Sequence, residues 1–128
     1  MSRFHRLAIA MLPLSVLPAV SSASAAPIGD AVKGKTIFIR CAMCHTVQPG
    51  MNKVGPSLAG IVGRNAGAVP GFAYSPAMKT SKVVWTPQML DRFLARPSAA
   101  VPGTRMVFAG LPNPADRANV VAYLKAPK

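Results

Sequence analysis

The five residues CAMCH, from Cys41 to His45, constrain this chain more than any other stretch of its sequence. The two cysteines stand about one helical turn apart, and a histidine follows the second one directly. Such a group occurs in redox dithiols, in zinc sites and where haem is attached covalently. Each kind of site needs different support from the rest of the chain, so the remaining sequence decides between them.

The first two kinds of site find little support. A thioredoxin-like dithiol follows a strand in a βαβ unit, and no strand pattern precedes Cys41. A structural zinc ion needs four Cys, His or carboxylate ligands. Without the N-terminal leader described below, the chain holds two cysteines, one histidine and three aspartates. Cys41, Cys44 and the adjacent His45 cannot easily all face one tetrahedral ion.

The third kind of site, c-type haem, has C-x-x-C-H as its attachment signature. Two thiols one turn apart can reach the two vinyl groups on one edge of the porphyrin, and the next imidazole then lies under the iron. The motif therefore predicts one covalently bound haem c. Cys41 and Cys44 are the expected thioether links, and His45 is the expected axial ligand.

The second axial position has several candidates. The chain beyond the leader has no second histidine, which favours methionine, and His/Met ligation raises the reduction potential. Met43 lies inside the attachment loop, and Met89 falls on an apolar helical face typical of core packing. Met51 and Met106 lie in loops. Met106 is far along the chain from His45, which favours it, although the sequence pattern alone leaves the other methionines open.

The first 25 residues have the layout of a secretory signal peptide. Two arginines precede an apolar run over residues 7–20, and small residues follow it up to Ala25. The run is shorter than the about 20 apolar residues that a membrane anchor needs, and it contains two prolines. We expect cleavage after Ala25 and a single domain over residues 26–128. Export predicts a soluble periplasmic protein without stable membrane insertion, and it suits c-type haem, which is attached outside the cytoplasm.

The expected mature domain is strongly basic. It keeps all of the fifteen Lys and Arg residues except Arg3 and Arg6, it has three aspartates and no glutamate, and its formal charge is therefore +10. Such a surface favours acidic partners. Because export argues against nucleic acid, we expect acidic faces of redox proteins as the partners.

Helix signals in the mature chain are short and are separated by long loops. Expected helices begin at a capping residue, in three cases followed by proline; these caps are Asp30, Ser75, Thr86 and Asn113. The third of these helices is expected to stop at Pro97, with loop after it. Residues 46–74 are rich in Gly and Pro, and we expect ordered loops there with one helical turn near residues 57–62. The pattern predicts an all-α domain whose short helices and long loops wrap around one haem.

Taken in order, these motifs resemble class I cytochromes c of the mitochondrial and short bacterial type. The resemblance runs from about Gly29 to Lys125, and its matching pieces are GKTIFIRCAMCHTV, KVGPSLAGIVGRNAG, PGFAYS, Trp85, VPGTRMVFAG and DRANVVAYLK. It implies the cytochrome c fold, a monomer, and electron transfer without enzymatic activity.

The resemblance also implies roles for single residues. The Pro56 carbonyl would accept a hydrogen bond from His45 and so fix its ring. Met106 would be the distal ligand, and Phe108 the aromatic residue at the haem edge. Four residues match positions that surround the haem propionates: Arg64, Tyr74, Trp85 and Thr104. Gly34 would face Tyr123 where the first and last helices cross.

Some positions depart from the family pattern. Phe93 stands where many relatives have tyrosine, and Met78 stands where many have asparagine, so the interior is less polar. Near the exposed haem edge, three lysine positions of mitochondrial relatives hold other residues: Ser98, Pro112 and Asn113. Part of the basic ring remains, in Arg40, Lys53 and Arg105. The expected docking face is therefore positive but altered.

The predicted function is that of an electron carrier. It would run between a membrane quinol-oxidising cytochrome complex and a terminal oxidase or photosynthetic reaction centre. One alternative is a dedicated cytochrome subunit of a periplasmic dehydrogenase. Another is a peroxidase-like or ligand-binding haem protein, which needs an open distal site and usually a catalytic His, Glu or Arg. The only histidine beyond the leader is already used and there is no glutamate, which argues against that alternative.

Overall fold

The structure is a computed structural model, and it describes residue 25 and residues 27–128. The predicted signal peptide lies outside the described residues except for Ala25, so its cleavage stays a prediction. The described helices are α1 (Ala31–Ala42), α2 (Pro76–Thr80), α3 (Pro87–Ala95), α4 (Pro97–Ala100) and α5 (Pro114–Lys125). Within residues 27–128 the only β pairing is an isolated bridge between Asn65 and Val84. The predicted all-α class is confirmed.

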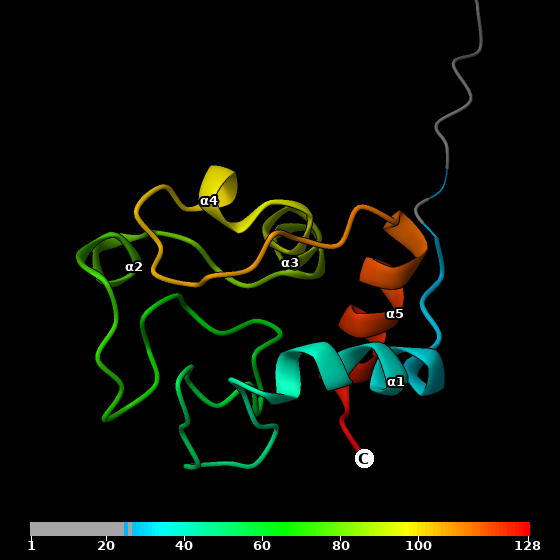
Figure 1. The fold of residues 1–128 in the computed structure, drawn as a ribbon, viewed down its shortest axis with the longest axis horizontal. Helices are drawn as coiled ribbons and strands as arrows, with labels where there is room; N and C mark the ends of the chain where they lie inside the picture. The colour runs from blue at the N-terminus through cyan, green and yellow to red at the C-terminus, as the bar shows by residue number, and fades with distance from the viewer. Residues whose placement is uncertain (1–24, 26) are drawn as a thin grey trace, which may run out of the picture.

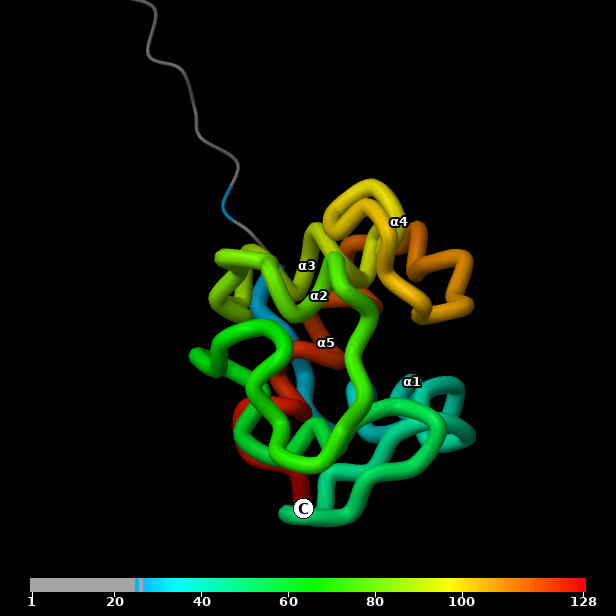
Figure 2. The backbone as a smooth tube through the Cα atoms, turned by 90° about the vertical axis from the view of Figure 1, so that its left-hand side faces the viewer, coloured from blue at the N-terminus to red at the C-terminus, as the bar shows by residue number. Residues whose placement is uncertain are grey.

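None of the helices in the described ranges is both long enough and apolar enough to cross a membrane. In Figure 1 the loop that follows α1 forms the lower left of the molecule, and the segment between α4 and α5 passes below α4 and crosses the view towards the right. α3 packs against both α4 and α5. Figure 2 shows the same loops from the side, around α5 near the centre.

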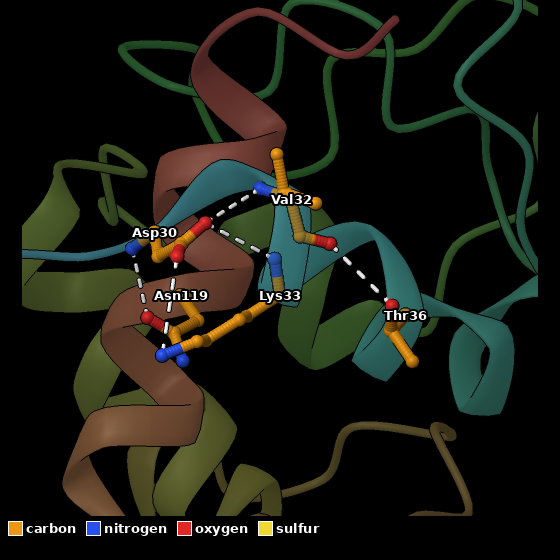
Figure 3. Close-up of polar contacts among 5 residues, drawn as sticks. All are labelled: Asp30, Val32, Lys33, Thr36 and Asn119. Atoms are coloured by element: carbon orange, nitrogen blue, oxygen red, sulfur yellow. Dashed lines mark hydrogen bonds and ion pairs between the residues drawn. The ribbon is translucent and has the colours of Figure 1, made fainter.

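The four predicted capping residues are all confirmed. At the start of α1 the carboxylate of Asp30 accepts hydrogen bonds from the backbone N–H groups of Val32, at 2.9 Å, and Lys33, at 3.2 Å. The backbone N–H of Asp30 donates to the side-chain oxygen of Asn119 at 2.8 Å, as Figure 3 shows. The first residue before α1 is therefore tied directly to α5.

α1 and α5 cross closely at the predicted position (Figure 1). Gly34 is buried there, and a Cβ atom at this position would overlap the backbone carbonyl of Asn119. One turn further on, the rings of Phe38 and Tyr123 lie with their centroids 5.3 Å apart. Glycine therefore lets two helices that are distant in the sequence approach until their backbones touch.

Two local predictions were wrong. Residues 97–100 were expected to be loop, but they form α4, because Pro97 is well suited to the first position of a new helical turn after the extended residue Arg96. Residues 57–62 do not form a helical turn; they form successive tight turns instead. Gly60 and Gly63 there adopt positive φ angles of 64° and 88°, which a right-handed helix does not allow.

Candidate haem-binding site

A cavity of about 460 Å³ lies among α1, α2, α3, α5 and the two long loops. Its volume falls within the roughly 300–1,000 Å³ of ordinary cofactor sites. The cavity brings together all of the site residues predicted from the sequence: Cys41, Cys44, His45, Pro56, Arg64, Tyr74, Trp85, Thr104, Met106 and Phe108. The remaining lining is largely apolar and includes Phe93 and Met78, the two positions where the sequence departs towards a less polar interior.

One wall of the cavity is the end of α1 and the turn that follows it. The backbone N–H groups of Cys44 and His45 both donate to the carbonyl of Cys41, at 3.0 and 2.9 Å. The helical turn therefore continues through the motif and keeps the two thiols and the imidazole together. Nδ1 of His45 lies 2.8 Å from the carbonyl oxygen of Pro56. Nδ1–H donates in this contact, so Nε2 carries the lone pair that can bind a metal ion.

Gly55 is a site residue that the sequence did not reveal. A Cβ atom at this position would overlap the imidazole ring of His45. The backbone N–H of Gly55 also donates to the carbonyl of Cys44 at 2.7 Å, which closes the loop onto the motif. The signal available in the sequence was its place directly before Pro56, a residue already predicted to contact the histidine.

Burial sets the protonation of the histidine. It lowers the pKa of His45, and the positive charge of Lys53 lowers it further, although the hydrogen bond to Pro56 opposes this shift. This shift favours the neutral imidazole, which is the form that binds metal ions. Burial also raises the pKa of the Cys41 thiol, while Arg40 acts in the opposite direction.

Another wall of the cavity contains the segment around Met106. Thr104, Met106 and Phe108 are half-buried and alternate with exposed residues, as expected for an extended segment with one face towards the cavity. The hydroxyl of Thr104 accepts a hydrogen bond from the backbone N–H of Met106 at 3.4 Å. The guanidinium of Arg40 in α1 lies 6.0 Å from the ring centroid of Phe108, a distance suited to a cation–π contact.

The five candidate methionines are separated by their positions. Met43 and Met51 are exposed and, like Met89, they do not line the cavity. Met78 and Met106 do line it. Met78 is buried in α2 as part of the hydrophobic core, whereas Met106 is on a loop. The choice of an axial ligand is thereby reduced to two methionines that a substitution can distinguish.

A third part of the cavity is polar. The guanidinium of Arg64 donates to the carbonyls of Ala59 and Ser57, both at 2.9 Å. Its Nε atom is buried and has no hydrogen-bond partner among the described residues. Burial lowers the pKa of Arg64, which Tyr74 partly offsets. A buried N–H without an acceptor costs about 1–3 kcal/mol, so this position suits an anionic ligand group such as a haem propionate. The residues present therefore fit a haem.

Comparison with known proteins decides the family. The family model described as Cytochrome c matches residues 31–127. This chain belongs to the cytochrome c family. The cytochrome is 52% identical to cytochrome c2 of Rhodomicrobium vannielii over 106 residues, which cover 82% of this chain and 85% of the relative. It is 49% identical to cytochrome c2 of Rhodopila globiformis over 104 residues, which cover 80% of this chain and 98% of that relative.

A solved structure supports the same family. Cytochrome cH from Methylobacterium extorquens matches with a TM-score of 0.73 and 43% identity, over 76% of this chain and 98% of its own. The resemblance to class I cytochromes c is therefore confirmed, and with it the cytochrome c fold. Family membership implies one covalently attached haem c, which the C-x-x-C-H motif fits. The protein is an electron carrier and not an enzyme.

Proposed function

We propose that this cytochrome is a soluble periplasmic electron carrier with His45 and Met106 as the axial ligands of its haem iron. The observation that carries the proposal is the placement of these two side chains in one cavity, although they come from distant parts of the chain. The bound haem supplies the one-electron chemistry between ferrous and ferric iron. With both axial positions filled, the protein has little to rearrange when the electron arrives or leaves.

We propose a defined task for each of the other predicted residues. Cys41 and Cys44 hold the haem covalently, and the Pro56 carbonyl keeps the His45 ring in position. Arg64, whose buried Nε–H has no hydrogen-bond partner among the described residues, donates to a haem propionate. The remaining residues complete the enclosure of the propionates and the haem edge: Tyr74, Trp85, Thr104 and Phe108.

The proposed location depends on the N-terminal segment. Residues 1–25 would be a cleaved signal peptide, and residues 26–128 would form a monomeric periplasmic domain. Charged, apolar and small residues in the order expected for export support this proposal. The attachment chemistry supports it too, because c-type haem is joined to its protein outside the cytoplasm.

The proposed partners are acidic redox proteins. Arg40 and Arg105 are exposed and line the cavity, and Lys53 is exposed on the loop next to it. Such cations steer an acidic face towards the haem edge. A membrane quinol-oxidising cytochrome complex is the proposed donor, and a terminal oxidase or a photosynthetic reaction centre is the proposed acceptor.

Absorption spectra of the purified protein test the ligation. We expect low-spin spectra that carbon monoxide does not change, and a weak sulfur-to-iron band in the oxidised form. Met106→Ala should lose that band and bind carbon monoxide promptly. Met78→Ala is the matched control, because it removes the other methionine of the cavity, and it should keep the band. Prompt carbon monoxide binding by the wild type would contradict the proposed ligation.

A further inference from the structure

The segment that carries Met106 makes few backbone hydrogen bonds. We call residues 102–112 the methionine loop. The backbone N–H of Thr104 donates to Val101, and that of Leu111 donates to Leu94. Between those two residues, no backbone group of the loop is hydrogen-bonded to another backbone group of the described chain. The position of Met106 is therefore set by how the two ends of the loop are fixed.

The C-terminal end of the loop is fixed by close packing on α3. Leu111 is almost fully buried, with 1% of its surface exposed, and its backbone N–H lies 2.7 Å from the carbonyl of Leu94. Gly110 has a φ of 108°, and a Cβ atom there would overlap the carbonyl of Ala95. This end of the loop thus lies directly against the end of α3.

Arg117 in the first turn of α5 joins this loop end to two helices. Its Nη1 donates to the carbonyls of Leu111, at 2.8 Å, and Pro112, at 3.0 Å. Its Nε donates to the carboxylate of Asp91 in α3 at 2.7 Å. The side chain of Arg117 is only 12% exposed. Hydrogen bonds from a charged, planar guanidinium are short and directional, so one side chain holds α3, α5 and the loop in fixed relation.

We infer that Arg117 is a positioning residue for Met106: by tying the Leu111 and Pro112 carbonyls to α3 and α5, it keeps the methionine loop closed over the cavity and the thioether of Met106 on the iron. Arg117 does not line the cavity, so it acts through the loop. The inference rests on the proposed ligation by His45 and Met106.

A purely structural role for Arg117 makes a different prediction. If Arg117 only joined α3 to α5, its loss would weaken the whole fold and leave loop opening unchanged while the protein is folded. Val121→Ala is the matched control, because Val121 is buried in the same helix and does not line the cavity. It weakens core packing and removes no hydrogen bond to the loop.

The experiment compares holoproteins under conditions where circular dichroism shows each variant fully folded. Three readouts report opening of the loop. They are the sulfur-to-iron band of the oxidised protein, the rate of carbon monoxide binding to the reduced protein, and the rate of tryptic cleavage after Arg105, an exposed residue of the loop. The third readout does not depend on the iron.

For Arg117→Ala we expect carbon monoxide binding and cleavage after Arg105 to be at least about tenfold faster than in Val121→Ala, with a weakened band. A tenfold change corresponds to about 1.4 kcal/mol in the opening equilibrium. The loop of Arg117→Lys should open at a rate between those of Arg117→Ala and Val121→Ala, because lysine keeps the positive charge but lacks the planar guanidinium. Should Arg117→Ala fail to fold, Arg117→Lys and Asp91→Ala decide, and we expect about threefold faster opening in each.

Two results would overturn the inference, and they are distinguishable. If the wild type lacks the sulfur-to-iron band, Met106 is not on the iron, and the proposed ligation fails together with the inference. If the wild type has the band and the Arg117 variants open no faster than Val121→Ala, the ligation stands and the inference alone fails.

Discussion

The three guanidinium nitrogens of Arg64 differ in their hydrogen bonds. Two terminal nitrogens hold the carbonyls of Ser57 and Ala59, and so fix the turns of the loop that follows the haem motif. Nε has no partner among the described residues, and it is the nitrogen that we propose for a haem propionate. The same side chain thus holds the loop and, in the role that we propose, neutralises the charge of a haem propionate.

Arg64→Lys tests this division of tasks. Lysine keeps the positive charge, but its single ammonium cannot bond both carbonyls and also face the cavity as the planar guanidinium does. We therefore expect the free energy of unfolding to fall by about 1–3 kcal/mol. Denaturant unfolding of the holoprotein measures it. Arg96→Lys, at an exposed position, is the control and should stay within about 0.5 kcal/mol of the wild type. Equal stability of the Arg64→Lys variant and the wild type would argue against the role of the planar guanidinium.

At the scale of elements, the crossing of α1 and α5 depends on the absence of a side chain at Gly34. Alanine is the better helix former by about 0.5–1 kcal/mol, which by itself would favour Gly34→Ala. The added Cβ would meet the rigid backbone carbonyl of Asn119, which cannot move without shifting α5. The steric cost therefore outweighs the gain in helix propensity.

We predict that Gly34→Ala lowers the free energy of unfolding by about 1–3 kcal/mol or more, as overpacking against backbone does. Thermal and denaturant unfolding provide the measurement. Lys35→Ala, the exposed neighbour in the same helix, should change stability by less than about 0.5 kcal/mol. A Gly34→Ala variant as stable as the wild type would mean that the helices can separate at no cost.

An element could be predicted from the sequence where the residues that determine it lie close together in the chain or belong to a known motif. Helix starts were predictable because a capping residue and the helix it begins lie within four residues. The members of the site were predictable because C-x-x-C-H and the motifs after it stand in a recognisable order. The bond of Arg117 to Asp91 was not, because it joins positions 26 residues apart that no motif marks. The fit of Gly55 behind His45 was not either, because it depends on the exact approach of the backbone to the ring, although the neighbouring Pro56 marks the segment. α4 was missed because Pro97 can both end one helix and begin another.

On the scale of the whole molecule, a large positive charge is combined with exposed apolar side chains. The expected mature domain carries a formal charge of +10, from thirteen basic residues against three aspartates. α1 also presents exposed apolar side chains at Val32 and Ile39, and Met43 directly after the helix is exposed too. Charge attracts partners over long distances and is screened by salt, whereas apolar contact is not. Encounter with a partner should therefore depend on salt more than the final contact does.

We predict that the oxidation of the reduced protein by membranes of its source organism slows as salt rises, because the Debye length shortens to about 8 Å at physiological ionic strength. Arg105→Gln should lower the rate at low salt and flatten the salt dependence. Lys82→Gln removes an equal charge from a residue that does not line the cavity, and it should have the smaller effect. A rate independent of salt in the wild type would contradict electrostatic steering.

The contact between α1 and α5 has a consequence for the order of events in biosynthesis. α1 is made long before α5, so during synthesis it has no helix to pack against, and the central contact of the fold cannot form. If the protein is exported as we propose, a chain in that condition can be threaded through an export channel. It also leaves the C-x-x-C-H motif at the end of α1 open to the machinery that joins haem to it. Under the same proposal, docking of α5 would complete the central contact of the fold after haem attachment.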